Sequence, residues 1–198
     1  MRLILASNSA SRKAMLTDAG IPFAAEASGA DEDAAKAALA EVGTSARDTA
    51  DALAELKAIK VSMRHPSDLV LGSDSIVVLD DGTILDKPAT RDDAERHLNA
   101  MSGKTHRLIS AAVVAEAGRP VWRHVDIAKL QVRALSDDFI RTYLDAEWPA
   151  IAGCVGCFRI EGPGVQLFAR TEGSHFTILG MPLLPVLDFL RVRGILAS

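Results

Sequence analysis

The chain has 198 residues, of which 48% are hydrophobic and 24% charged, and its formal net charge at pH 7 is −4. This balance excludes the apolar-poor, highly charged composition of a disordered chain. The acidic excess argues against binding of long nucleic acid, so any bound anion is expected to be small. No run of apolar residues is long enough for a membrane span, and the first residues lack a signal-peptide layout, so we expect a cytoplasmic protein without membrane contact.

A short buried strand is predicted at 3–5, followed by a polar turn and a helix over about 11–19. The turn holds Ser7 and Ser9 and passes directly into the first turn of the helix. Free backbone N–H groups and the helix dipole favour an anion at such a position. We therefore predict that this turn, up to Arg12, contributes to substrate binding.

A second, alanine-rich helix is predicted after Asp31, and a firmer helix over 47–63. The apolar stripe of the latter is predicted to be Leu53, Leu56, Ile59 and Met63. On this pattern Lys57 lies on another face and is by default a solvated lysine.

A buried strand with a polar insert at 72–75 is predicted over 69–79, and a short strand follows at 83–85. The remaining predicted elements are a helix from Thr90 to Gly103, paired strands at 108–116 and 121–132, a helix capped by Ser136, a glycine-rich loop at 153–164, a strand at 165–169 and a helix at 182–196. Helices and strands thus alternate irregularly and include a hairpin. The pattern predicts an α/β fold with a mixed central sheet flanked by helices.

Five charged residues stand out against these mostly apolar patterns: Arg12, Glu32, Lys57, Asp74 and Lys87. The three cations could hold the oxygens of a polyphosphate. The two carboxylates could carry a divalent metal and orient or deprotonate a water molecule. Asp74 is the most informative, because a carboxylate on a buried strand is either capped locally or kept at a site for use.

Several familiar motifs are absent from the sequence, among them the phosphate-binding loop of many nucleotide hydrolases and the glycine-rich dinucleotide motif. Cys154 and Cys157 form a C-x-x-C pair, but no second cysteine or histidine pair stands at zinc spacing. Two small buried thiols are the better interpretation of this pair.

Seven segments in order resemble the motifs of the Maf-like nucleotide pyrophosphatases, and they cover nearly the whole chain. They are 3–12 with Leu16, Asp31-Glu32, 53–58, 72–75, Lys87-Pro88 with 102–106, 156–162, and 180–183 with the final helix. The resemblance implies an α/β fold like that of inosine triphosphatases, with two lobes around a cleft and one domain over 1–198. It also implies hydrolysis between the α and β phosphates of a small-molecule nucleotide, a divalent cation such as Mg²⁺ or Mn²⁺, and often a homodimer.

By matching position, Asp74 would be the general base, and Glu32 and Asp74 would hold the metal. Arg12, Lys57 and Lys87 would hold phosphates, with the two lysines also assigned to catalysis.

Ser11, Ser75 and Glu161 match the positions that separate the family's branches. Glu161 resembles the branch that acts on 7-methyl-GTP, since a carboxylate suits the N–H donors of a guanine edge and a positively charged base. The alternative substrates are dTTP and UTP. The alternative function is a nucleotide-sensing regulator of septum formation with little turnover.

Overall fold

The computed structural model describes residues 1–197, which form two compact units. Unit 1 comprises 1–75, 109–126 and the chain from Gly180 onward, and unit 2 comprises 76–108 and 127–179. The helices and strands confirm the predicted α/β class. No helix among the described residues combines the length and hydropathy that a membrane crossing requires.

Unit 1 contains β1 (Leu3–Leu5), α1 (Ala10–Asp18), β2 (Phe23–Ala25), α2 (Glu32–Glu41), α3 (Ala46–Ser62) and α7 (Leu183–Val192). Unit 2 contains β4 (Ile84–Leu85), α4 (Arg91–Met101), α5 (Asp137–Glu147), the 3₁₀ helix η1 (Pro163–Leu167), β7 (Phe168–Glu172) and α6 (His175–Ile178). The long strands β3 (Leu69–Leu79), β5 (Thr105–Glu116) and β6 (Arg119–Val132) contribute residues to both units.

The sheet is mixed, as predicted, with strand order β2-β1-β3-β5-β6-β7 and with β4 beside β3. β1 is parallel to both β2 and β3, and its Leu3 lies opposite Leu69 of β3. The pairs β3–β4 and β6–β7 are antiparallel. Parallel strands need crossover connections, and here α1 and the segment with α2 and α3 provide them.

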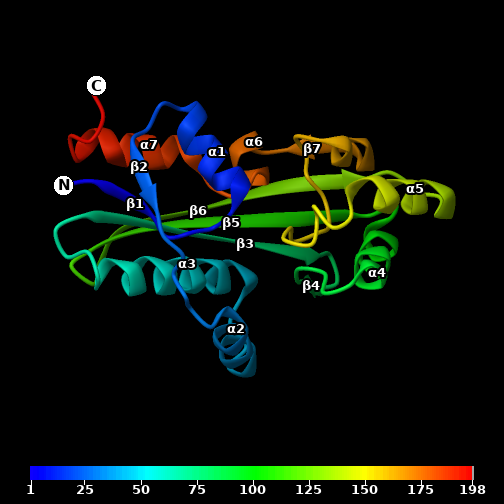
Figure 1. The fold of residues 1–198 in the computed structure, drawn as a ribbon. Coiled ribbons are helices and arrows are strands. Elements are labelled where there is room, and N and C mark those ends of the chain that lie inside the picture. The colour runs from blue at the N-terminus through cyan, green and yellow to red at the C-terminus, as the bar shows by residue number, and fades with distance from the viewer. Residues whose placement is uncertain (198) are drawn as a thin grey trace. The chain divides into compact units, whose positions relative to one another are not determined.

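In unit 1, α3 covers one face of the sheet, and α1 and α7 lie on the other (Figure 1). The packing of α3 is very close at Gly72, because a Cβ there would lie 2.2 Å from the carbonyl oxygen of Ala54. Only glycine leaves room for the helix backbone at this point.

The predicted apolar stripe of α3 is wrong in part. Leu56 and Met63 are exposed, whereas the buried face consists of Thr49, Ala50, Leu53, Ala54, Lys57, Ala58, Val61 and Ser62. Small residues occupy this face because the helix backbone approaches β3 so closely. Lys57 is therefore a buried residue and not a solvated lysine.

The strand predicted at 165–169 exists, but the structure places it three residues later. Residues 163–167 form η1, which begins with a proline at its first position, and β7 starts only at Phe168. β2 and α6 are only three and four residues long, and neither was predicted from the sequence. The final helix is shorter than predicted and ends at Val192.

Unit 2 has its own hydrophobic core. It is built on Leu98 and Met101 of α4, Ile140 and Leu144 of α5, and strand residues such as Leu130. The segment after α5 packs on this core through Ile151, Cys157 and Phe158.

Candidate functional site

Residues 72–75 of β3 carry side chains alternately to the two faces of the strand. Gly72 and Asp74 share the face covered by α3, since Gly72 contacts the α3 backbone and Asp74 bonds to Lys57. Ser73 and Ser75 point to the opposite face, where both hydroxyls donate to the carbonyl of Gly180. Because side chains alternate along a strand, β3 has two different faces here. We call the face with Asp74 the charged side and the face with Ser73 and Ser75 the hydroxyl side.

Lys57 forms the centre of the charged side. Its Nζ lies 2.7 Å from Oδ1 of Asp74 and 2.9 Å from Oε2 of Glu32, so one ammonium joins two carboxylates. Lys57 and Asp74 are nearly fully buried, while Glu32, in the first turn of α2, is partly exposed. The structure thus brings together three of the five charged residues that the sequence singled out.

The second carboxylate oxygen of Asp74, Oδ2, is buried and has no hydrogen-bond partner among residues 1–197. A buried carboxylate oxygen without a partner is costly, because it has lost its hydration. Such an atom in a native structure indicates a position where a ligand, a water molecule or a cation belongs. Asp74 is therefore both held in place by Lys57 and equipped to act on a bound group.

Arg12 forms the centre of the hydroxyl side. Its Nε donates to the Gly180 carbonyl at 2.8 Å, its Nη2 to Ser75 Oγ at 3.0 Å and its Nη1 to Ser7 Oγ at 3.4 Å. Burial lowers the pKa of Arg12, and the nearby charges of Asp74 and Glu32 oppose this shift. An arginine stays protonated even so, which leaves a fixed buried positive charge close to the two carboxylates.

The turn before α1 is organised around the same arginine. Ser9 is the N-cap of α1 and accepts from the backbone N–H of Arg12, and Ser7 Oγ accepts from the backbone N–H of Ser9. Ser7 is buried and Ser9 half-buried, as is Ser11 in the first turn of the helix. The predicted substrate-binding serines of this turn thus lie together at the N-terminus of α1, where the helix dipole is positive.

Two further residues of this hydrogen-bond network were not predicted from the sequence. Gly180 has φ +106°, and its carbonyl accepts from Arg12, Ser73 and Ser75 at once. Ser110, fully buried on β5, lies 2.9 Å from Ser75 Oγ. The signal that could have found this network is the alternation of 72–75, which predicts a second polar partner on the face away from Asp74.

The other two predicted residues, Lys87 and Glu161, belong to unit 2, and both are exposed. Both act on the same neighbour, Cys154. Burial raises the pKa of the Cys154 thiol, the charge of Glu161 raises it further, and the charge of Lys87 lowers it. Within unit 2, Lys87 and Glu161 therefore each lie within electrostatic range of Cys154, although they are far apart in sequence.

Both cysteines are free thiols, Cys157 buried and Cys154 half-buried. The prediction of two buried thiols is thus confirmed for Cys157 and only partly met by Cys154.

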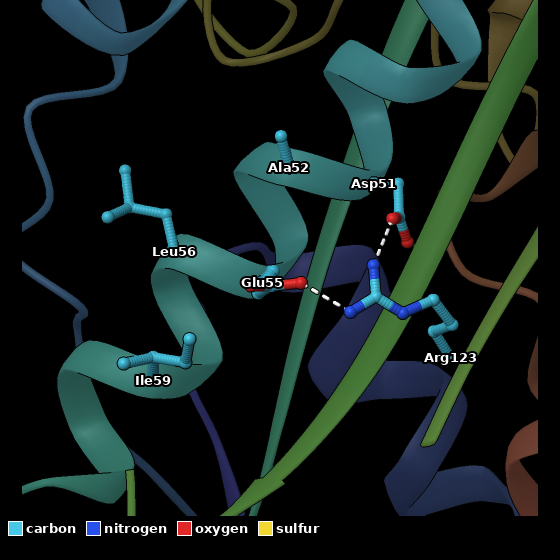
Figure 2. Close-up of a pocket in the computed structure, with 6 residues that line it drawn as sticks. All are labelled: Asp51, Ala52, Glu55, Leu56, Ile59 and Arg123. Atoms are coloured by element: carbon cyan, nitrogen blue, oxygen red, sulfur yellow. Dashed lines mark hydrogen bonds and ion pairs between the residues drawn. The ribbon is translucent and has the colours of Figure 1, made fainter. Parts of the chain in front are cut away.

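A hollow between α3 and Arg123 of β6 contains none of the predicted site residues. It is lined by Asp51, Ala52, Glu55, Leu56, Ile59 and Arg123. Figure 2 shows the guanidinium of Arg123 between the carboxylates of Asp51 and Glu55. One guanidinium against two carboxylates leaves this hollow with a net negative charge, so it does not compete with the Asp74 cluster as a candidate site for a polyphosphate.

No group of three or more histidine, cysteine, aspartate or glutamate side chains in the described part of the chain could hold a metal ion alone. Glu32 and Asp74 nevertheless fit a hard divalent cation. Mg²⁺ is commonly bound through one or two carboxylates and completes its shell with substrate oxygens and water. The unpartnered Oδ2 of Asp74 is consistent with such a shared site.

An α/β fold that places buried cations beside two carboxylates and a helix N-terminus defines a protein suited to small polyanionic substrates. The chain belongs to the Maf-like protein family, whose model matches residues 2–193. The resemblance predicted from the motifs is therefore confirmed.

Similar proteins cover almost the full length of the chain. It is 50% identical over 195 residues to a protein of Sphingopyxis alaskensis, with 98% of each chain covered. It is 48% identical over 196 residues to a protein of a Jannaschia species, covering 99% of this chain and 98% of the relative. A protein of Caulobacter vibrioides is 48% identical over 192 residues, with 97% and 96% covered. All three are named nucleoside triphosphate pyrophosphatases, which is the enzyme activity that the motifs predicted.

Proposed function

We propose that this chain hydrolyses nucleoside triphosphates between the α and β phosphates and releases a monophosphate and pyrophosphate. The observation that carries the proposal is the buried Lys57, whose ammonium holds Asp74 and Glu32 while Oδ2 of Asp74 stays without a partner among residues 1–197. The names of the relatives support the same activity. We also propose a cytoplasmic location, in keeping with a nucleotide substrate.

In the proposed reaction Asp74 is the general base. Its Oδ2 accepts a proton from a water molecule whose oxygen attacks the α-phosphorus. A new bond forms between that oxygen and phosphorus, the bond to the bridging oxygen breaks, and pyrophosphate leaves with the bonding electrons. Lys57 fixes the orientation of Asp74 through Oδ1, so that only Oδ2 faces the water.

Glu32 and Asp74 would hold a divalent cation, Mg²⁺ or Mn²⁺. When bound, such a cation supplies positive charge that offsets the charge developing on the phosphate oxygens. Arg12 and the N-terminal turn of α1 supply fixed positive potential and hydroxyl groups, with Ser7, Ser9 and Ser11 as the substrate contacts. Lys87 is proposed to hold phosphate oxygens as well.

For the base we propose 7-methyl-GTP. The support is Glu161, because its exposed carboxylate can accept hydrogen bonds from a guanine edge and favours a base with positive charge. We propose that Ser11 and Ser75 also contribute to selection of the base. The competing substrates are dTTP and UTP, which offer fewer N–H donors to a carboxylate.

The test is a nucleotide panel with Mg²⁺ or Mn²⁺, with products separated as monophosphate and pyrophosphate. The panel contains 7-methyl-GTP, GTP, dTTP, UTP and CTP. Pyrophosphate release that is fastest with 7-methyl-GTP is the expected result. A preference for dTTP or UTP would keep the reaction and overturn the base assignment. No hydrolysis by folded protein would overturn the reaction and favour a nucleotide-sensing regulator.

A further inference from the structure

The segment that carries Glu161 leaves α5 and runs through four glycines before it reaches β7. Such a segment has high conformational freedom, so the position of Glu161 depends on what restrains it. One restraint lies at Cys157, whose carbonyl accepts from the buried hydroxyl of Tyr143 at 3.0 Å. The Sγ of Cys157 also lies 3.4 Å from Nδ1 of His97.

A stronger restraint lies two residues before Glu161. The Nε and Nη2 atoms of Arg159 each lie 3.0 Å from an oxygen of Glu147, the last residue of α5. This two-bond arrangement fixes the direction of the guanidinium as well as its distance. Gly164 then closes the segment, since a Cβ there would lie 2.5 Å from the Arg159 carbonyl oxygen.

Burial of Glu147 makes its pairing with Arg159 energetically necessary. The side chain of Glu147 is 4% exposed, whereas that of Arg159 is 37% exposed. A carboxylate removed from water in this way requires its cation, because an unpaired buried charge is strongly unfavourable. The hydrogen bonds to Glu147 raise the pKa of Arg159, and the charge of Glu161 adds to the shift, which places Glu161 within electrostatic range of the pair.

We propose that Arg159 and Glu147 are a positioning pair that sets the base preference of the enzyme by fixing the loop on which Glu161 stands. The inference rests on the proposed function, because it assigns Glu161 to base selection. Arg159 acts through the backbone of residues 159–161 and does not contact the nucleotide. The same pair would fix the loop for whichever base Glu161 selects. A carboxylate that selects a base must be held to within a fraction of an ångström.

The experiment compares Glu147→Gln with Asp145→Asn. Asp145 stands on the same helix and also pairs with an arginine, Arg91, but at the exposed surface. For each variant we would measure kcat/KM on the preferred and on the next-best nucleotide of the wild-type panel. In Glu147→Gln the ratio is expected to fall about five-fold, mainly through a higher KM for the preferred nucleotide. Asp145→Asn is expected to keep the wild-type ratio.

Two further measurements separate positioning from other roles. Backbone hydrogen exchange over 157–162 is expected to be about ten-fold faster in Glu147→Gln than in wild type, without any nucleotide present. Arg159→Lys keeps the charge but loses the two-bond geometry, and it should lower the ratio like Glu147→Gln. If Arg159→Lys changes the ratio and Glu147→Gln does not, Arg159 contacts the nucleotide itself and the inference is overturned.

An equal loss on all nucleotides in Glu147→Gln would also overturn it, since that result indicates a purely structural pair. Failure of the proposed function is a different result. It would show as absence of hydrolysis in the wild-type protein, while the exchange measurement would still report whether the pair restrains the loop.

Discussion

The charged cluster of unit 1 and the Glu161 loop of unit 2 are built on opposite principles. Asp74 lies on a strand, Lys57 on a long helix, and both are nearly fully buried with short bonds between them. Lys87 and Glu161 lie in exposed connecting segments, and the pair of Arg159 with Glu147 of α5 restrains the segment of Glu161. The residues proposed for chemistry stand on regular elements that hold them directly, whereas the residue proposed for base selection stands on a loop and needs a separate restraint.

The largest expected effect comes from the unit 1 cluster. Asp74→Asn keeps the shape of the side chain but removes its ability to accept a proton, so kcat should fall about 10³-fold. Nucleotide binding should persist, because Arg12 and the turn before α1 are unchanged. Pyrophosphate release and equilibrium nucleotide binding would measure the two quantities.

Asp68→Asn is the matched control, since Asp68 is also a buried carboxylate of unit 1 and pairs with Arg2 at 2.8 Å. Its turnover should stay within about two-fold of wild type, because it lies outside the site. Equal activity loss in both variants would indicate that Asp74 acts only through the fold.

The next prediction concerns the close packing of α3 on β3, which supports the cluster of Lys57, Asp74 and Glu32 in unit 1. In Gly72→Ala the new Cβ would lie 2.2 Å from the Ala54 oxygen and 2.7 Å from the Ala58 nitrogen. The helix α3 must then move away from β3, at a cost of about 3 kcal/mol in unfolding free energy. Urea denaturation would measure this change.

Gly153→Ala is its counterpart in unit 2. A Cβ at Gly153 would meet no atom of the described residues within 4 Å, so the unfolding free energy should change by no more than about 0.5 kcal/mol. Similar losses in the two variants would contradict the contrast between a tightly packed unit 1 support and an open unit 2 loop.

A pH effect is expected from the core beneath the Glu161 loop. His106 is fully buried near Phe158 and Phe168, and neither ring nitrogen has a hydrogen-bond partner among residues 1–197. Burial lowers the pKa of His106 to about 4. The unfolded chain binds a proton at this residue below about pH 6.5 and the folded chain does not, so stability is lost as the pH falls from about 6.5 to 4.

The loss from His106 should approach roughly 3 kcal/mol at the lower end of this range. His106→Phe has no proton to bind and should unfold with a shallower pH dependence in urea titrations between pH 7 and 4.5. An unchanged slope in this variant would show that other groups cause the acid sensitivity.

The smallest effect belongs to the exposed loop. Glu161→Gln keeps the size of the side chain but replaces a charge and one acceptor by a neutral amide, so preference for 7-methyl-GTP over GTP should fall about ten-fold. The kcat on GTP should change little, because the unit 1 cluster is intact. A ten-fold drop on every nucleotide would instead place Glu161 in the chemistry and erase the difference between the two regions.

Much of the fold follows from local pattern. The caps at Thr90 and Ser136 marked two helices, and the period of 69–79 indicated one buried strand with a polar insert. The errors fell where local pattern is weak. A proline and two glycines turned 163–167 into a 3₁₀ helix, and the three-residue β2 was too short to predict.

By itself, the sequence determined the family, the α/β class and the set of charged residues from which a site can be built, because motif order and strand and helix periods are local properties. Tertiary structure decided which of these residues meet. Lys57 joins Asp74 and Glu32 only because Gly72 lets α3 approach β3, and the Gly180 carbonyl reaches Arg12, Ser73 and Ser75 from the other end of the chain. Burial and long-range contact depend on packing between distant segments, and no local pattern encodes them.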